Sequence, residues 1–88
     1  MSAAPRVRGD AVFREVGDEW VVYDPRARRL HALNLTAALV WAFCDGEAEV
    51  DEIALKVRSA LATAPDEATV RADVDRVLGD FREAGLLE

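Results

Sequence analysis

The apolar pattern of this chain changes period at Asn34, and that change restricts the fold more than any other feature. Before Asn34 the apolar residues are mostly β-branched or aromatic and stand in short runs separated by turn residues, which favours strands. After Asn34 they recur every three to four residues, which favours amphipathic helices. Strands followed by helices are typical of an α+β domain, in which helices cover one face of an antiparallel sheet.

Three strands are expected before Asn34. The first, 12–16, and the second, 20–23, flank Gly17-Asp18, a dipeptide typical of hairpin turns. Asp24-Pro25 then begins a second turn, because Pro sets the turn dihedral and Asp can bond its own backbone. A short third strand, 30–33, follows. Together these strands form a three-stranded antiparallel β-meander.

Three helices are expected after the meander. The first follows Asn34, whose side chain can accept from the free N–H groups of a helix start, and it ends at Asp45-Gly46. The second covers about 50–62 and the third about 67–84, with Gly85 as a C-terminal stop. This order of elements resembles a winged helix-turn-helix arrangement.

The chain has 88 residues, which is enough for one small domain only. Residues 1–10 show no sustained apolar period and are expected to form a flexible N-terminal tail, so the domain is expected to span 11–88. Ala64-Pro65-Asp66 is expected to separate the last two helices, and Leu86-Leu87 is expected to fold back onto the core. The large residues expected in the core are Leu33, Leu39, Trp41, Phe43, Ile53, Val57, Leu78 and Phe81.

The charge balance argues against nucleic acid as a partner. The formal net charge is -6 at pH 7, which opposes binding to a polyanion. In the last predicted helix Arg71, Arg76 and Arg82 are outnumbered by Asp and Glu. A winged-helix DNA-binding transcriptional regulator is therefore kept only as the alternative function. The chain also lacks a signal-peptide core and an apolar run long enough for a membrane span, which favours a cytoplasmic protein with no membrane partner.

Few side chains in this sequence suggest catalysis. Cys44 is the one cysteine and His31 the one histidine, so neither an internal disulfide nor a metal site of three or four N/S ligands is expected. Cys44 lies on an apolar predicted helix, which is typical of a buried, inert thiol. His31 lies on a predicted strand, which is typical of a surface or edge residue. We expect no cofactor and no enzymatic activity.

A series of short motifs covers most of the chain from about Val12 onward. They are His31-x-Leu33-Asn34-x-Thr36-Ala37, Val40-Trp41, Cys44-Asp45-Gly46, Glu52-Ile53, Asp73-Val74, Phe81 and Gly85-Leu86-Leu87. In this combination the chain resembles the PqqD-like family. The resemblance implies a recognition element for ribosomally made, post-translationally modified peptides. One departure is Glu49, which stands where family members often have Ser or Thr as the helix cap.

What the resemblance implies about function is a non-catalytic peptide chaperone. Such a domain binds the leader of a precursor peptide and presents it to a modifying enzyme, such as a radical SAM protein or a peptidase. The resemblance does not choose among pathways that make a quinone cofactor, lasso peptides or products of a group associated with a kinase related to HPr kinase.

The resemblance also places the peptide between the third predicted strand and the last predicted helix. An edge strand carries unpaired N–H and C=O groups that can accept an added strand. For the helix residues the alternative is plain core packing, which we favour at Val74. The implied contacts are Arg29, Leu30, His31, Ala32 and Leu33 from the strand and Val70, Asp73, Val74 and Val77 from the helix.

Two features of the strand region leave alternatives open. A free strand edge can also pair with a second copy of the chain, so a weak homodimer remains an option. Arg26, Arg28 and Arg29 form a basic cluster at the second turn, which either solubilises the loop or attracts an acidic peptide.

Overall fold

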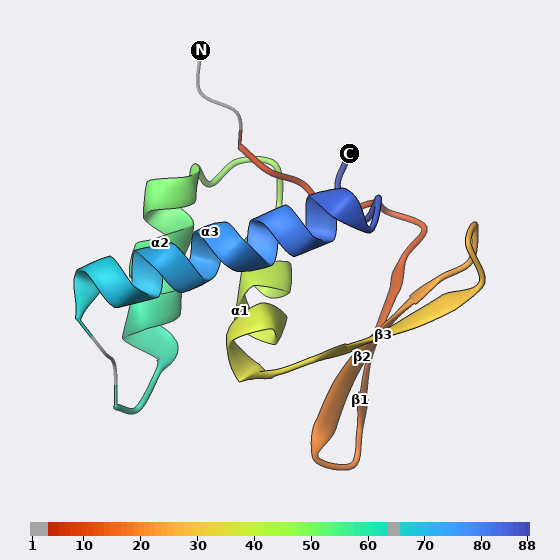
Figure 1. The fold of residues 1–88 in the computed structure, drawn as a ribbon, viewed down its shortest axis with the longest axis horizontal. Helices are drawn as coiled ribbons and strands as arrows, with labels where there is room; N and C mark the ends of the chain where they lie inside the picture. The colour runs from red at the N-terminus through yellow and green to blue at the C-terminus, as the bar shows by residue number, and fades with distance from the viewer. Residues whose placement is uncertain (1–3, 64–65) are drawn as a thin grey trace.

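The computed structural model describes residues 4–63 and 66–88, in which three strands are followed by three helices (Figure 1). The strands pair antiparallel in the order β1-β2-β3. The predicted α+β class and order of elements are confirmed. Residues 64–65 of the predicted helix breaker lie outside the described residues. The elements are β1 (Val12–Val16), β2 (Glu19–Asp24), β3 (Arg29–Leu33), α1 (Leu35–Phe43), α2 (Val50–Ala60) and α3 (Glu67–Glu83).

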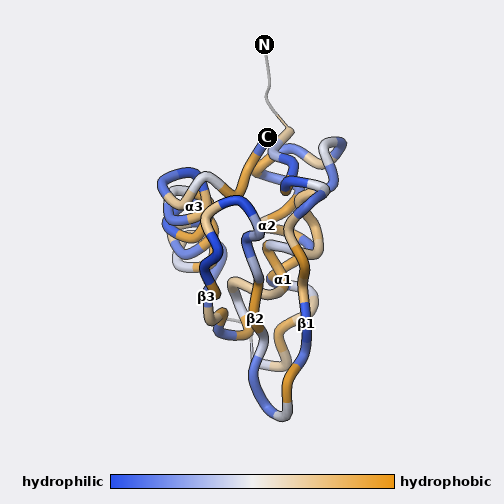
Figure 2. The backbone as a smooth tube through the Cα atoms, turned by 90° about the vertical axis from the view of Figure 1, so that its right-hand side faces the viewer, coloured by the Kyte–Doolittle hydropathy of each residue, from blue (hydrophilic) through white to orange (hydrophobic). Residues whose placement is uncertain are grey.

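The register of the sheet decides which strand residues face the helices. Val22 is paired with Phe13 on β1 and with His31 on β3, and it is fully buried, so this row faces the helical layer. Successive side chains of a strand point to opposite faces. The next row therefore faces away from the helices, where Tyr23 and Leu30 are exposed. In Figure 2 the sheet lies nearest the viewer with the helices behind it.

Side-chain caps begin two of the three helices. The side chain of Asn34 accepts a hydrogen bond from the N–H of Ala37, and that of Asp66 accepts from Thr69, both at 2.9 Å. Glu49 precedes α2 and makes no such bond. The interpretation of Glu49 as a poor cap is confirmed, because its longer side chain does not turn back to the helix start.

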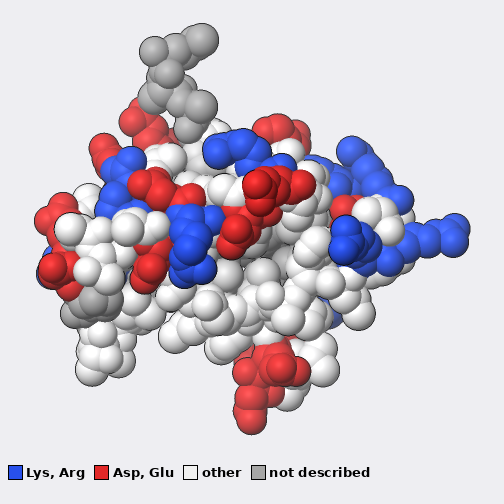
Figure 3. All heavy atoms as spheres, in the orientation of Figure 1, with Lys and Arg blue, Asp and Glu red and all other residues white. Residues whose placement is uncertain are grey.

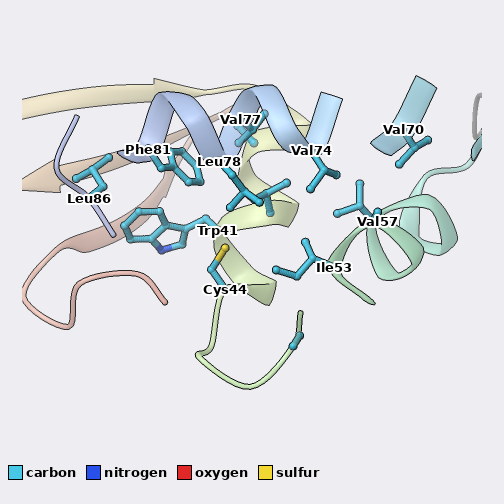
Figure 4. Packing of buried hydrophobic residues seen from close by; sticks show 14 of the residues in the cluster. Trp41, Cys44, Ile53, Val57, Val70, Val74, Val77, Leu78, Phe81 and Leu86 are labelled. Atoms are coloured by element: carbon cyan, nitrogen blue, oxygen red, sulfur yellow. The ribbon is translucent and has the colours of Figure 1, made fainter. Parts of the chain in front are cut away.

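The core lies where the three helices meet the inner face of the sheet (Figure 4). The Trp41 ring of α1 contacts the Phe81 ring of α3 edge-on, with centroids 5.4 Å apart and planes at 87°. Leu33, Leu39 and Phe43 are only partly buried at the margin of this core. The other residues predicted for the core are buried as expected: Trp41, Ile53, Val57, Leu78 and Phe81.

The buried face of α1 differs from the simplest reading of its sequence. The spacing predicts an apolar face made of Leu35, Leu39, Val40 and Phe43. Val40 is fully buried and Leu39 and Phe43 are partly buried, yet Leu35 is 47% exposed and the small residues Ala37 and Ala38 are buried. The reason is that α1 packs against α2, α3 and β3 together. A nearly all-apolar helix does not reveal which side its neighbours occupy, and alanine allows them to approach closely.

The N-terminal segment corrects the prediction of a flexible tail. The N–H of Val7 donates to the Cys44 carbonyl at 3.1 Å, and the N–H of Arg8 donates to the Leu86 carbonyl at 2.9 Å. Residues 6 and 7 thus pair with the loop after α1 and with the C-terminal residues, while residues 1–3 lie outside the described part. Backbone pairing of this kind needs no apolar repeat, so the sequence pattern does not show it. Leu86 is buried, which confirms the predicted fold-back.

Replacing Ile53 by Ala tests the position of the core. Ile53 is fully buried on α2, so the change should lower the free energy of unfolding by about 2–5 kcal/mol through lost burial and a cavity. Leu55→Ala, two residues away on the same helix, is the matched control. Since Leu55 is 55% exposed, its effect should stay within about 0.5 kcal/mol. Urea unfolding measures both, and equal losses would contradict the assigned inner face of α2.

Candidate functional site

A groove of about 200 Å³ lies between β3 and α3. Its apolar lining includes Leu33, Val77 and Phe81, and its polar groups include Arg76 and Asp80. Below the charged surface of α3, Figure 3 shows a hollowed, mostly uncharged region. The remaining lining residues are His31, Ala32, Asn34, Ala37, Ala84 and Leu86.

β3 forms one edge of the sheet, because the strand order is β1-β2-β3. In the part of the chain that the structure describes, its far side therefore has no neighbouring strand. Backbone N–H and C=O groups on that side are a template for pairing with an extended segment. The groove follows this edge, so an added strand would lie with one side against β3 and side chains toward α3.

The strand residues expected at the site divide between the two faces of the sheet. His31, Ala32 and Leu33 belong to the groove lining. Leu30 is 69% exposed on the outer face, and Arg29 begins the strand outside the lining. The prediction of His31 as an edge-strand residue is confirmed.

The helix residues expected at the site are less uniform. Val77 lines the groove, whereas Val70 and Val74 are buried among the helices. Core packing, the alternative favoured for Val74, is what the structure shows for that residue. Asp73 is half-exposed and forms an ion pair with Arg76 at 3.6 Å.

The sequence interpretation missed the part of the groove nearest the end of α3. Asp80, Phe81 and Ala84 follow Val77 at intervals of three, four and seven residues, so they share its face of the helix. Extending the helical period by two turns beyond Val77 would have found them.

One polar atom beside the groove has no hydrogen-bond partner. It is Nε2 of His31, which is buried and unpaired among the described residues. An unpaired buried donor or acceptor costs about 1–3 kcal/mol. Because the ring belongs to the groove lining, this nitrogen is an open hydrogen-bonding position at the site.

The charges on α3 do not suit a nucleic-acid reader. Arg71 pairs with Asp51 and, at 3.2 Å, with Asp75. The acidic side chains on the exposed surface of this helix would repel phosphate groups at close range. The structure therefore gives the DNA-binding alternative no basic recognition helix.

The thiol of Cys44 is buried in the core and not on the groove. Burial, followed by the charge of Asp45, raises the pKa of the Cys44 thiol to about 12. The predicted buried thiol is thus confirmed, and it is overwhelmingly protonated at neutral pH. In the described ranges, no cluster of three or more His, Cys, Asp or Glu side chains is placed to hold a metal ion. None of the helices described there combines the length and apolar character that a membrane span requires.

A buried ion pair lies beyond one end of the groove. The Arg8 guanidinium donates to both carboxylate oxygens of Asp24, at 2.9 and 3.2 Å, and also to Asp10. Asp24 in turn accepts from the N–H groups of Arg26 and Ala27, which holds the β2–β3 turn. The hydrogen bonds from Arg8 are the main reason that the pKa values of Asp10 and Asp24 lie below their usual value of 3.8.

This arrangement predicts a loss of stability in acid. A carboxyl group with a lowered pKa in the folded state stabilises the protein above its unfolded pKa, and the contribution disappears as pH falls through the folded pKa. For Asp10 and Asp24 the urea midpoint should therefore fall as pH drops below about 3.8. Asp24→Asn removes one of these groups, so its midpoint should depend less on pH. An unchanged pH dependence in that variant would contradict the assignment.

Comparisons with known proteins give a family-model match and two similar solved structures. The family model for coenzyme PQQ synthesis protein D (PqqD) matches residues 19–87, which include both walls of the groove. A solved structure described as TbiB1 in complex with the TbiA(beta) leader peptide has a TM-score of 0.77 at 19% identity, covering 94% of each chain. A lasso peptide synthetase B1 complexed with the leader peptide has a TM-score of 0.78 at 19% identity, covering 97% of this chain and 98% of its own. A search of the curated proteins gives no match.

Proposed function

The chain belongs to the PqqD family, and we propose that its groove between β3 and α3 binds the leader of a ribosomally made precursor peptide. The observation that carries the proposal is the coincidence of a groove of mixed apolar and polar lining with a free strand edge. The two similar structures, which share the fold, are complexes with leader peptides. An extended peptide is the ligand class that uses a strand edge and a groove together.

In this proposal the leader adds to β3 as a fourth strand. Backbone groups of Arg29–Leu33 position the peptide, and its side chains on one face enter the groove. Val77, Asp80 and Phe81 select those side chains from the α3 wall, with Asp73 at the rim. Val70 and Val74 support the wall from inside the core.

The proposed role is delivery and not catalysis. Cys44 is buried and protonated, and none of the described residues that line the groove with His31 carries a hydroxyl or a thiol that would act as a nucleophile. The chemistry would then belong to a modifying enzyme that receives the bound precursor, such as a radical SAM protein, a peptidase or a related tailoring enzyme. No cofactor is required for peptide capture of this kind.

Titration of ¹⁵N-labelled protein with synthetic leader peptides encoded near its gene tests the proposal. Amide signals of Leu30–Leu33 and of residues 77–84 should shift together, because the backbone edge of β3 and the C-terminal part of α3 lie on the two sides of the groove. No shift at these positions with any of the peptides, or shifts confined to α2, would overturn it.

Proline substitutions at the free edge make a sharper prediction. Proline removes a backbone donor, and the amides of adjacent strand residues point in opposite directions. Of His31→Pro and Ala32→Pro, the one that removes the outward N–H should weaken leader binding by about 1–3 kcal/mol, while the other should destabilise the sheet. Calorimetric titration measures binding and circular dichroism measures folding. His31→Ala and Ala32→Ser, which keep the N–H, are the controls; wild-type affinity in both folded proline variants would contradict strand addition.

We also propose that self-association, where it occurs, uses the same edge. A second copy of the chain can pair with β3 as an extended peptide does. A saturating leader should then shift the mass toward monomer in sedimentation experiments. A dimer that is unaffected by the peptide would place the contact elsewhere.

A further inference from the structure

We propose that Arg8 is a positioning residue for the groove, which ties the start of β3 to the end of α3 and so fixes the separation of the two walls. The biological meaning of the tie rests on the proposed function. The geometry of the tie does not depend on that function, so the role of Arg8 can be tested both with and without a peptide.

The Arg8 side chain uses every donor that a guanidinium possesses. Its Nε donates to Asp10 at 3.0 Å, and one terminal nitrogen donates to Asp10 and Asp24 at 2.8 and 2.9 Å. The other terminal nitrogen donates to Asp24 at 3.2 Å and to the Gly85 carbonyl at 2.9 Å. A guanidinium has five N–H donors in a fixed plane, so all are paired. The side chain is only 8% exposed, which shields these bonds from water.

The partners of Arg8 belong to the two walls. Asp24 ends β2, is paired with Arg29 at the start of β3, and holds the intervening turn through two backbone N–H groups. Gly85 follows the end of α3, and its N–H donates to the Arg82 carbonyl in the last turn of that helix. One guanidinium therefore joins the turn that leads into β3 to the C-terminal end of α3.

The opposite end of the groove is closed by a different connection. There β3 continues through Asn34 into α1, and both Asn34 and Ala37 line the groove. α1 in turn packs against α3. The two walls are thus connected through α1 at one end and by Arg8 at the other, with the groove between them.

Lysine would not replace Arg8 in this role. A lysine ammonium is a compact charge with three donors, whereas the guanidinium fork binds two carboxylates and a carbonyl in one plane. The charges that face Arg8 are Asp10 and Asp24, and Arg26 pairs with Asp10 from the turn at 2.9 Å. Removing the guanidinium would leave Asp24 buried without its cation and the Gly85 carbonyl without this donor.

A merely structural role and a positioning role predict different results for binding. If Arg8 only stabilises the fold, the folded fraction of an Arg8 variant should bind a leader with wild-type affinity. If Arg8 fixes the separation of β3 and α3, that separation should vary in the folded variant, and only part of the molecules should have a groove of the right width. The apparent dissociation constant should then rise in inverse proportion to the competent fraction.

The first experiment measures the walls without a peptide. Spin labels are placed on cysteines introduced at Ala32 on β3 and Glu83 on α3, both exposed positions. Cys44 is buried with a pKa raised to about 12, so native labelling should modify only the introduced thiols. Dipolar spectroscopy measures the distance between the two labels. The distribution of this distance should be broader, and its mean longer, in Arg8→Met than in the wild type.

Arg6→Met is the matched control for this measurement. Arg6 lies on the same N-terminal segment, but its side chain is 64% exposed, and its ion-pair partner among the described residues is the exposed Glu88, at 3.6 Å. Its distance distribution should equal that of the wild type. An unchanged distribution in folded Arg8→Met would overturn the proposal.

The second experiment measures the affinity of a leader peptide identified by the titration above. With variants held folded, as checked by circular dichroism, Arg8→Met should bind about tenfold more weakly if the competent fraction falls to about a tenth. Arg8→Lys should not restore the affinity, and Arg6→Met should leave it unchanged. Wild-type affinity in folded Arg8→Met would also overturn the proposal.

Asp24→Asn provides a second variant in case Arg8→Met does not fold. Its amide oxygen can still accept from the turn N–H groups, while the charge that holds Arg8 is lost. Asp24→Asn should also broaden the distribution of distances between the two spin labels and lengthen its mean. A wild-type protein that binds no leader would count against the proposed function, whereas the distance measurement would still decide the role of Arg8.

Discussion

The packing of α1 against α2, α3 and β3 is the constraint on which the rest of the structure depends. α1 is short, and it connects the sheet to the helical layer both through the chain and through side chains. Trp41 brings α3 onto α1 by its edge-on contact with Phe81, so α3 crosses beside β3 with a groove between them. The groove is therefore a consequence of how the core is filled, and its floor includes core residues such as Phe81.

Hydrophobic packing alone does not connect the β2–β3 turn to the C-terminal end of α3. There the N-terminal segment lies between the β2–β3 turn and the C-terminal residues and bonds to both. Directional hydrogen bonds make this connection in place of apolar contacts. Arg8 donates to Asp24 and to the Gly85 carbonyl. A buried ion pair of this kind fixes the relative position of its partners more dependably than it increases the free energy of unfolding.

Local sequence patterns predicted the elements well because strands and helices follow from period and turn residues near each position. Asn34 marked the boundary between the two halves, and each predicted element ended within two residues of the observed one. The tail was mispredicted at Val7 and Arg8, since their partners lie far along the chain. For the site, the free edge of β3 was predictable, but the choice between Val74 and Phe81 as groove residues depends on how α3 is rotated against α1.

The side chains of β3 alternate between the two faces of the sheet, while its backbone forms the free edge. Backbone pairing and side-chain selection are therefore separate kinds of recognition. The backbone edge can position any extended peptide, because its donors and acceptors carry no side-chain information. In the proposed binding mode, selection depends on the face toward α3, where His31 and Leu33 line the groove together with Val77 and Asp80, while the Leu30 side chain faces outward. A fold that divides the work in this way can keep its binding geometry while its groove lining changes. The fold itself is shared with the two similar structures at 19% identity, which shows that this shape is retained where most side chains differ, since strand pairing constrains shape far more than sequence.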